Sequence, residues 1–273
     1  MELDWMQIVV ISVLLGLILL YELSNTFKYY AKMTLYYTLL QIQALIIIIL
    51  SLPRPRDPSN HRWASMLLSN TNGLFGIRAE VRGLHHLDYN KPAIVVANHQ
   101  SSIDLMSMFS FGVWPKRCVV LGKKELLFFG PFGVSLYLCG TVFVDRLNPE
   151  KARSTMEKTA QHIKDKNIKV WIFPEGTRNR ETGLLPFKKG AFHLAVQAQV
   201  PVIPIVFSSY SDFYSHREKR FGTGKFTITV LPPVSTEGKT SEDVNELTET
   251  VRKQMLTTYN ETSMQRMESN GLN

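Results

Sequence analysis

The order of hydrophobic and polar residues divides the chain into an apolar beginning and a mixed remainder. Residues 6–21 and 34–52 contain no charged side chain, and these runs approach the roughly 20 residues that a membrane-spanning helix needs. A cleaved signal peptide fits the first run poorly, because Glu2 and Asp4 stand where a basic segment is expected. A buried helix of a soluble protein is the alternative for the second run. We therefore predict a membrane-embedded region of two helices over residues 1–57, ended by the helix-breaking segment "PRPRDPSN".

Basic residues lie on both sides of the second apolar run and leave the orientation of the two helices open. Lys28 and Lys32 precede the run, and Arg54, Arg56 and Arg62 follow it, so the positive-inside rule favours neither orientation. A shallow hairpin in one leaflet would place both basic segments on the same headgroup surface. Two spanning helices and a one-leaflet hairpin are the alternatives.

From about residue 75 the pattern becomes that of a mixed α/β domain. Short β-branched runs predict strands at "IRAEVRG", "AIVVA", "CVVL", "TVFV", "KVWIF", "VIPIVF" and "FTITVL". Helical patterns lie between and after them, at residues 148–167, 188–199 and 240–256. Strands that alternate with helices predict an α/β fold, with a mostly parallel sheet flanked by helices, over residues 58–259. The polar tail of residues 260–273 is expected to be disordered.

Composition narrows the classes of partner. The 273 residues, 45% of them hydrophobic, are enough for one good-sized core or two small ones. A net charge of +8 favours phosphate-bearing partners. The basic segments show no aromatic interleaving and no nucleic-acid motif, so we expect an anionic membrane surface or a phosphorylated substrate, and no nucleic acid. Cys118 and Cys139 stand in apolar runs and are predicted to be core residues.

A histidine and an aspartate follow the predicted strand "AIVVA" in the segment "NHQSSID". Ligands of parallel α/β sheets bind beyond the carboxyl ends of the strands, and there Asp104 could orient the ring of His99 and stabilise its protonated form. Because the chain has no Gly-x-Ser-x-Gly motif, we predict that His99 deprotonates a substrate hydroxyl directly. The alternative is a helix start whose polar side chains only bind backbone. No metal site is predicted, because no second histidine or cysteine lies at ligand spacing.

Basic residues follow two other predicted strands. In "FPEGTR", Gly176 permits a tight turn whose N–H groups can face an anion, and Arg178 has a planar fork suited to phosphate oxygens. Glu175 could bind a hydroxyl or hold Arg178. Arg146 in "GTVFVDR", together with a lysine such as Lys124, would complete a phosphate clamp. A turn with surface charges is the alternative.

Taken in order, "NHQSSID", "GTVFVDR", "FPEGTR" and "VPVIPIVF" resemble the four motifs of the glycerolipid acyltransferases, most closely the animal 1-acylglycerol-3-phosphate acyltransferases. The resemblance spans residues 75–235. It implies acyl transfer from acyl-CoA to the sn-2 hydroxyl of lysophosphatidic acid, giving phosphatidic acid, with His99 as general base and Asp104 as its partner. The substrate-binding residues expected with them are Asn98, Lys124, Arg146, Glu175, Gly176, Thr177 and Arg178.

The remaining expectations concern location and alternative functions. Acyl-CoA would be a co-substrate and no cofactor is expected. The enzyme is expected in the endoplasmic reticulum membrane with its active site facing the cytosol. The alternatives are an esterase or thioesterase that uses the same two residues on water, an acyltransferase for another lysophospholipid, and a non-catalytic membrane-shaping protein.

Overall fold

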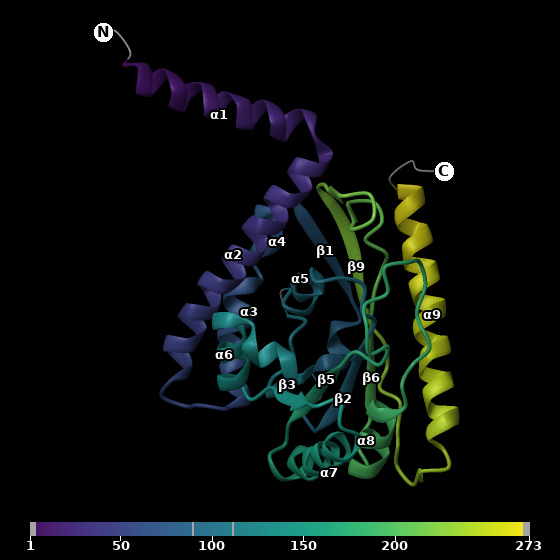
Figure 1. Ribbon diagram of the computed structural model, residues 1–273. Coiled ribbons are helices and arrows are strands. Elements are labelled where there is room, and N and C mark those ends of the chain that lie inside the picture. The colour runs from purple at the N-terminus through teal and green to yellow at the C-terminus, as the bar shows by residue number, and fades with distance from the viewer. Residues whose placement is uncertain (1–3, 89, 111, 270–273) are drawn as a thin grey trace.

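A seven-stranded sheet forms the centre of the computed structural model, which describes residues 4–88, 90–110 and 112–269 (Figure 1). Its strands in spatial order are β1 (Ile77–Arg82), β9 (Gly224–Val230), β6 (Val202–Phe207), β2 (Ala93–Ala97), β5 (Lys169–Ile172), β3 (Cys118–Lys123) and β4 (Val142–Val144). All neighbours are parallel except β6 and β9. The predicted mostly parallel sheet is therefore confirmed. The hairpin of β7 (Tyr214–Ser215) and β8 (Arg220–Phe221) was not predicted.

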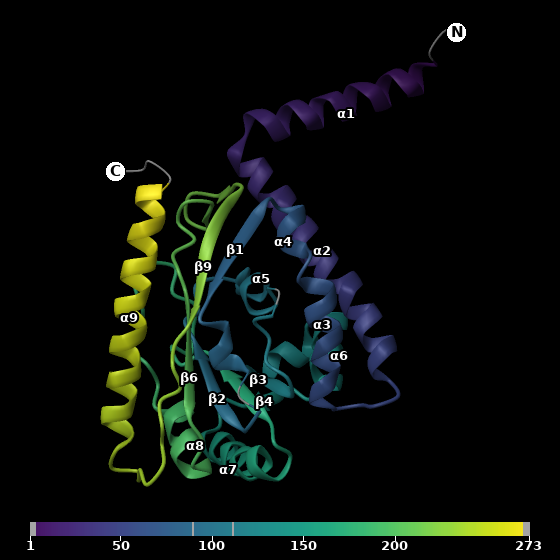
Figure 2. The same cartoon turned by 180° about the vertical axis from the view of Figure 1, so that it is seen from behind.

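Helices cover both faces of the sheet, which explains why its central strands read as continuous apolar runs. In β2, Val95 faces one core together with Trp171 of β5, whereas Ile94 and Val96 face a second core, as the two-residue period of a strand requires. The second core is closed by α7 (Pro149–Asp165), α8 (Gly190–Ala198) and α9 (Val244–Ser269). Figures 1 and 2 show α9 and α2 (Asn25–Ser51) on opposite sides of the sheet.

The first core is closed by α2 and several short helical segments. These segments are α3 (His61–Leu68), α4 (Thr71–Leu74), α5 (Asp104–Met108), α6 (Gly130–Leu138), η1 (Pro58–Asn60), η2 (Leu84–Leu87) and η3 (Lys124–Phe128). Cys118 and Cys139 are both buried in this core, as predicted.

Two long helices begin the described chain, α1 (Trp5–Leu23) and α2 (Asn25–Ser51). Both are long and apolar enough to cross a membrane by length and composition. No residue of α1 is buried, whereas one face of α2 packs against the domain. Residues 25–33, which lie between the two apolar runs, are also helical, because the Ser24 side chain caps α2 by accepting the Phe27 N–H and because Tyr29 and Met33 are buried.

The C-terminal segment also differs from the sequence prediction. Residues 260–269 were expected to be disordered, but they continue α9. Thr262 and Ser263 are buried, and the Ser263 hydroxyl accepts a hydrogen bond from the Ser209 N–H at 3.0 Å. The helix therefore continues because its polar residues pack against the loop that follows β6. Residues 270–273 lie outside the described part of the chain, and the proposed domain boundaries at residues 57 and 259 stay predictions.

Candidate active site

The carboxyl ends of β2, β5 and β6 meet at one edge of the sheet and bring three loops together. Val96 of β2 is in register with Ile172 of β5, and Ala97 is in register with Ile205 of β6. The loops that leave these strands carry His99, Glu175 and Ser208 respectively. This convergence is the one that the sequence predicted for a mostly parallel sheet.

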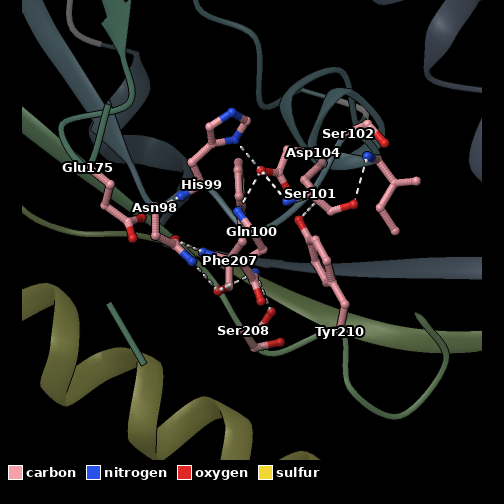
Figure 3. Close-up of polar contacts among 12 residues, drawn as sticks. Asn98, His99, Gln100, Ser101, Ser102, Asp104, Glu175, Phe207, Ser208 and Tyr210 are labelled. Atoms are coloured by element: carbon pink, nitrogen blue, oxygen red, sulfur yellow. Dashed lines mark hydrogen bonds and ion pairs between the residues drawn. The ribbon is translucent and has the colours of Figure 1, made fainter. Parts of the chain in front are cut away.

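His99 and Asp104 form a hydrogen-bonded pair at this edge (Figure 3). The distance from His99 Nδ1 to Asp104 Oδ2 is 2.6 Å. A carboxylate can only accept a hydrogen bond, so Nδ1 is the donor of this contact, and in the neutral ring the free lone pair is that of Nε2. The Asp104 side chain is 2% exposed and that of His99 is 21% exposed. The aspartate is thus held inside the protein while the histidine remains accessible to a substrate.

The carboxylate of Asp104 also organises the loop that carries the histidine. Its Oδ2 accepts the backbone N–H groups of Gln100 at 2.8 Å and Ser101 at 3.1 Å. Asp104 therefore does bind backbone at the start of α5, as the structural alternative proposed, and it holds the histidine ring as well. The ring of His99 stacks on Phe173 with centroids 4.1 Å apart and planes 18° apart, which fixes the plane in which Nε2 lies.

Glu175 is buried and ties the histidine loop to the "FPEGTR" segment. One carboxylate oxygen accepts the His99 N–H at 2.7 Å and the other accepts the Leu185 N–H at 2.9 Å. The Asn179 N–H donates to the His99 carbonyl at 2.7 Å, so both backbone groups of His99 are held. Burial raises the pKa of Glu175, against the opposing effect of the two N–H groups. The sequence predicted that Glu175 binds a hydroxyl or Arg178. In the structure its two oxygens instead accept hydrogen bonds from backbone N–H groups.

Asn98 likewise positions the loop, although the sequence assigned it to substrate. Its side-chain amide donates to the carbonyl of Phe207 at 2.9 Å and accepts the Phe207 N–H at 2.8 Å. The side chain is buried, and this pair of hydrogen bonds joins the end of β2 to the end of β6. Gln100 adds hydrogen bonds to the carbonyls of Phe207 and Ser208.

Two buried tyrosines that sequence reasoning missed support the same loop. The Tyr36 hydroxyl, from the apolar helix α2, donates to the Ser102 carbonyl at 3.0 Å. The Tyr210 hydroxyl lies 2.5 Å from the Ser107 hydroxyl. Burial and the nearby negative charge of Asp104 raise the pKa of Tyr210 well above its ordinary value, so this phenol stays protonated. Both contacts join residues more than 60 positions apart, so no local sequence pattern predicts them.

The predicted phosphate-binding residues are divided between two places. Arg146 Nη1 donates to the Gly176 carbonyl at 2.6 Å, and Lys124 pairs with Asp145 at 3.3 Å. The Lys124 hydrogen bond holds the pKa of Asp145 below its ordinary value. Gly176 makes the predicted tight turn with φ +72°, and its N–H donates to the Phe173 carbonyl within that turn.

Arg178 lines a different space, a cavity of about 970 Å³. Its walls come from the first half of α2, from Gln100 to Ser102 and from the β7–β8 hairpin, and they do not include Arg146 or Lys124. Arg146 and Lys124 therefore lie outside this cavity, and the clamp of Arg146, Arg178 and a lysine stays a prediction. His216 is exposed on this hairpin and is hydrogen-bonded to Tyr29 at 2.9 Å.

The arrangement suits proton transfer to and from a bound hydroxyl or thiol. The described contacts of the His99 side chain are with Asp104 and Phe173, and none is with a serine or cysteine that could serve as a nucleophile. The described residues also contain no group of three or more histidine, cysteine or acidic side chains placed to hold a metal ion. His99 is therefore placed to act on a substrate group directly.

Comparison with known proteins shows which family the chain belongs to. A family model described as Acyltransferase matches residues 78–208. The chain is 48% identical over 241 residues to 1-acyl-sn-glycerol-3-phosphate acyltransferase alpha of Mus musculus. This alignment covers 88% of this chain and 84% of that protein. The chain belongs to the 1-acyl-sn-glycerol-3-phosphate acyltransferase family. The family predicted from the four motifs is thereby confirmed, and the protein is an acyltransferase.

One further relative supports this acyltransferase assignment, and one solved structure supports the fold. The chain is 41% identical over 250 residues to 1-acyl-sn-glycerol-3-phosphate acyltransferase beta of Homo sapiens. This alignment covers 91% of this chain and 89% of that protein. The crystal structure of the 1-acyl-sn-glycerophosphate acyltransferase PlsC from Thermotoga maritima superimposes with a TM-score of 0.66. That match covers 87% of this chain and 94% of that one at 23% identity, so it supports the fold.

Proposed function

We propose that this acyltransferase moves a fatty acyl group from acyl-CoA to the sn-2 hydroxyl of 1-acyl-sn-glycerol 3-phosphate, giving phosphatidic acid and CoA. The names of the relatives support the acceptor. The observation that carries the chemistry is the 2.6 Å contact between His99 Nδ1 and Asp104 Oδ2, because it leaves Nε2 free to take a proton from the acceptor.

The mechanism needs one base and no covalent enzyme intermediate. His99 Nε2 takes the proton of the acceptor hydroxyl as the hydroxyl oxygen attacks the thioester carbon. Asp104 stabilises the imidazolium that forms. The tetrahedral intermediate then collapses, the carbon–sulfur bond breaks, and the leaving CoA sulfur receives the proton from His99. Proton and charge balance over the cycle, so the proposal includes no cofactor.

Arginines on the two flanks of the site are proposed to hold the acceptor phosphate. Arg178 and Thr177 have exposed side chains, and Arg146 reaches the carbonyl of Gly176 from the β4 side. Lys124 follows β3 on the same side as Arg146. Asn98 and Glu175 act on the backbone of the histidine loop, so we assign them to positioning.

Membrane association follows from the two apolar helices and from the nature of the acceptor, which is an amphiphile. We propose that α1 and α2 hold the enzyme at the bilayer. The endoplasmic reticulum membrane and a site that faces the cytosol complete the proposal, since acyl-CoA is a water-soluble cytosolic donor. Tyr36 gives this anchor a direct connection to the site.

The test uses the purified full chain in lipid vesicles with radiolabelled acyl-CoA. Parallel reactions contain lysophosphatidic acid, lysophosphatidylcholine, lysophosphatidylethanolamine or no acceptor. We expect label in phosphatidic acid with the first acceptor, and release of the label from that product by a phospholipase that cleaves at sn-2. Labelled free fatty acid at the same rate without any acceptor would identify a thioesterase, and equal transfer to all acceptors would refute the head-group assignment.

A further inference from the structure

A second group of exposed apolar side chains lies outside the two N-terminal helices, on η3 and α6. Phe128 is 77% exposed, Phe129 50%, Val134 44% and Tyr137 40%. Single exposed apolar residues are ordinary on protein surfaces, whereas a group of four on one short segment calls for an explanation. The segment "GPFGVSLYL" that forms α6 carries no charged residue, unlike a helix whose outer face meets water.

This apolar group is continuous with the exposed side of α2. Gln41 of α2 accepts the backbone N–H of Phe132 at 3.0 Å, which joins α6 to the middle of the apolar helix. In both views α6 lies beside α2 (Figures 1 and 2). The outward residues of α2 in this half are apolar, and the exposed ones include Ile42, Leu45 and Ile49. The surface that α2 presents is therefore extended sideways by α6.

Cationic residues lie at the edge of this apolar surface, as they do at the edge of surfaces that contact a membrane. The guanidinium of Arg56 lies over the Tyr137 ring at 5.1 Å, and Arg54 just before it is also exposed. Lys123 and Lys124 stand at the start of η3 and are separated from its apolar residues by Glu125, and all three are exposed. Aromatic side chains next to arginine and lysine are typical of the interface between hydrocarbon and headgroups. A rim of positive charge also fits anionic lipid better than it fits a second basic copy of this chain.

We propose that η3 and α6 form a second membrane contact, in which Phe128, Phe129, Val134 and Tyr137 enter the bilayer interface beside α2. This inference rests on the proposed membrane anchoring by α1 and α2, and it adds the part of the catalytic domain that touches lipid. It has a consequence for substrate delivery. Lys124 at the start of η3 lies at headgroup level and neighbours Asp145 and Arg146, so an acceptor would pass from the leaflet to the site with its phosphate at this lysine.

Fluorescent labelling tests the contact without using enzyme activity. The two native cysteines are 0% and 2% exposed, and burial raises the pKa of both thiols, so they should not react in the folded protein. Phe128→Cys in the full chain would carry a polarity-sensitive label, and Gln254→Cys on the exposed side of α9 is the matched control. Both proteins are placed in vesicles of phosphatidylcholine and phosphatidic acid.

The expected result is that lipids with a spin label near the headgroup quench the fluorophore at position 128 and not the one at position 254. Aqueous iodide should quench the label at position 254 and leave position 128 protected. Iodide quenching at both positions, without quenching by the lipid, would overturn the proposal. Protection of position 128 from both quenchers would also overturn it, in favour of contact between two copies of the chain.

Kinetics then test whether the contact matters for substrate delivery. Phe128→Asp should raise the KM for long-chain lysophosphatidic acid in vesicles about tenfold, since a phenylalanine is withdrawn from the interface. The KM for a short-chain acceptor that is monomeric in water should not change, and Gln254→Asp should alter neither value. Equal increases for both acceptors would refute a delivery role. If no acceptor is used at all, the proposed function fails while the labelling result still stands.

Discussion

Replacing Asp104 by asparagine removes the charge that faces His99 and keeps an oxygen that can accept hydrogen bonds. In the structure Oδ2 of Asp104 receives the Nδ1–H of His99 and the N–H groups of Gln100 and Ser101. Opposite unit charges about 4 Å apart interact by about 4 kcal/mol at an effective dielectric constant of about 20. This attraction exists only while the His99 ring is protonated, as it is when the hydroxyl attacks. Losing it should therefore lower kcat about 10³-fold.

The alanine variant separates this electrostatic effect from a structural one. Asp104→Ala deprives three N–H groups of their acceptor, and an unsatisfied buried donor costs about 1–3 kcal/mol. Asp104→Ala should therefore lower the melting temperature clearly, whereas Asp104→Asn should melt close to wild type. Release of CoA is followed with a thiol reagent, at saturating acyl-CoA and lysophosphatidic acid in vesicles. A kcat for Asp104→Asn within about threefold of wild type would refute the reasoning, because a charge that stabilises the protonated base cannot be dispensable.

Three other residues give predictions on binding, coupling and stability. Arg178→Ala should impair the use of lysophosphatidic acid and leave transfer to an uncharged monoacylglycerol unchanged, with Arg178→Lys restoring only part of the loss; kinetics on both acceptors check this, and equal losses would refute the phosphate contact. Tyr36→Phe removes the donor to the Ser102 carbonyl and should lower kcat several-fold at a cost of about 1–2 kcal/mol in stability; an unchanged kcat in vesicles would show that α2 does not position the loop. His61 is buried and its pKa is lowered to about 4. Since the unfolded chain takes up this proton first, stability is full above pH 6.5 and falls by roughly 3 kcal/mol toward pH 4; His61→Phe should flatten that loss in thermal melts across this range, and an unchanged slope would contradict it.

The sequence predicted the elements whose cause is local. The runs "AIVVA" and "KVWIF" are strands because β-branched and aromatic residues fill both faces of a buried sheet. The helix predicted over residues 148–167 begins where expected, since the Asn148 side chain caps α7 by accepting the Lys151 N–H. The His99–Asp104 pair was also predictable, because four intervening residues bring a strand end back to the first turn of a helix.

The features that the sequence did not predict depend on contacts between distant segments. The helical structure of residues 25–33 depends on burial of Tyr29 beside Tyr214 and His216, and that of residues 260–269 depends on Ser263 meeting Ser209. The backbone partners of Glu175 were also missed, because nothing near it in the sequence indicates that its oxygens accept the N–H groups of His99 and Leu185. Polar residues in a motif can therefore serve the backbone of the site as well as the ligand.

The proposed mechanism depends most on His99 as the base that activates the acceptor hydroxyl. The direct measurement is the rate of acyl transfer to lysophosphatidic acid by purified His99→Ala in vesicles, with a thermal melt of the same preparation. We predict a fall in kcat of about 10²–10⁴-fold with a melting temperature near that of wild type, because the side chain is partly exposed and Asp104 still accepts the two backbone N–H groups. A well-folded His99→Ala protein that transfers acyl groups within about tenfold of the wild-type rate would contradict the account.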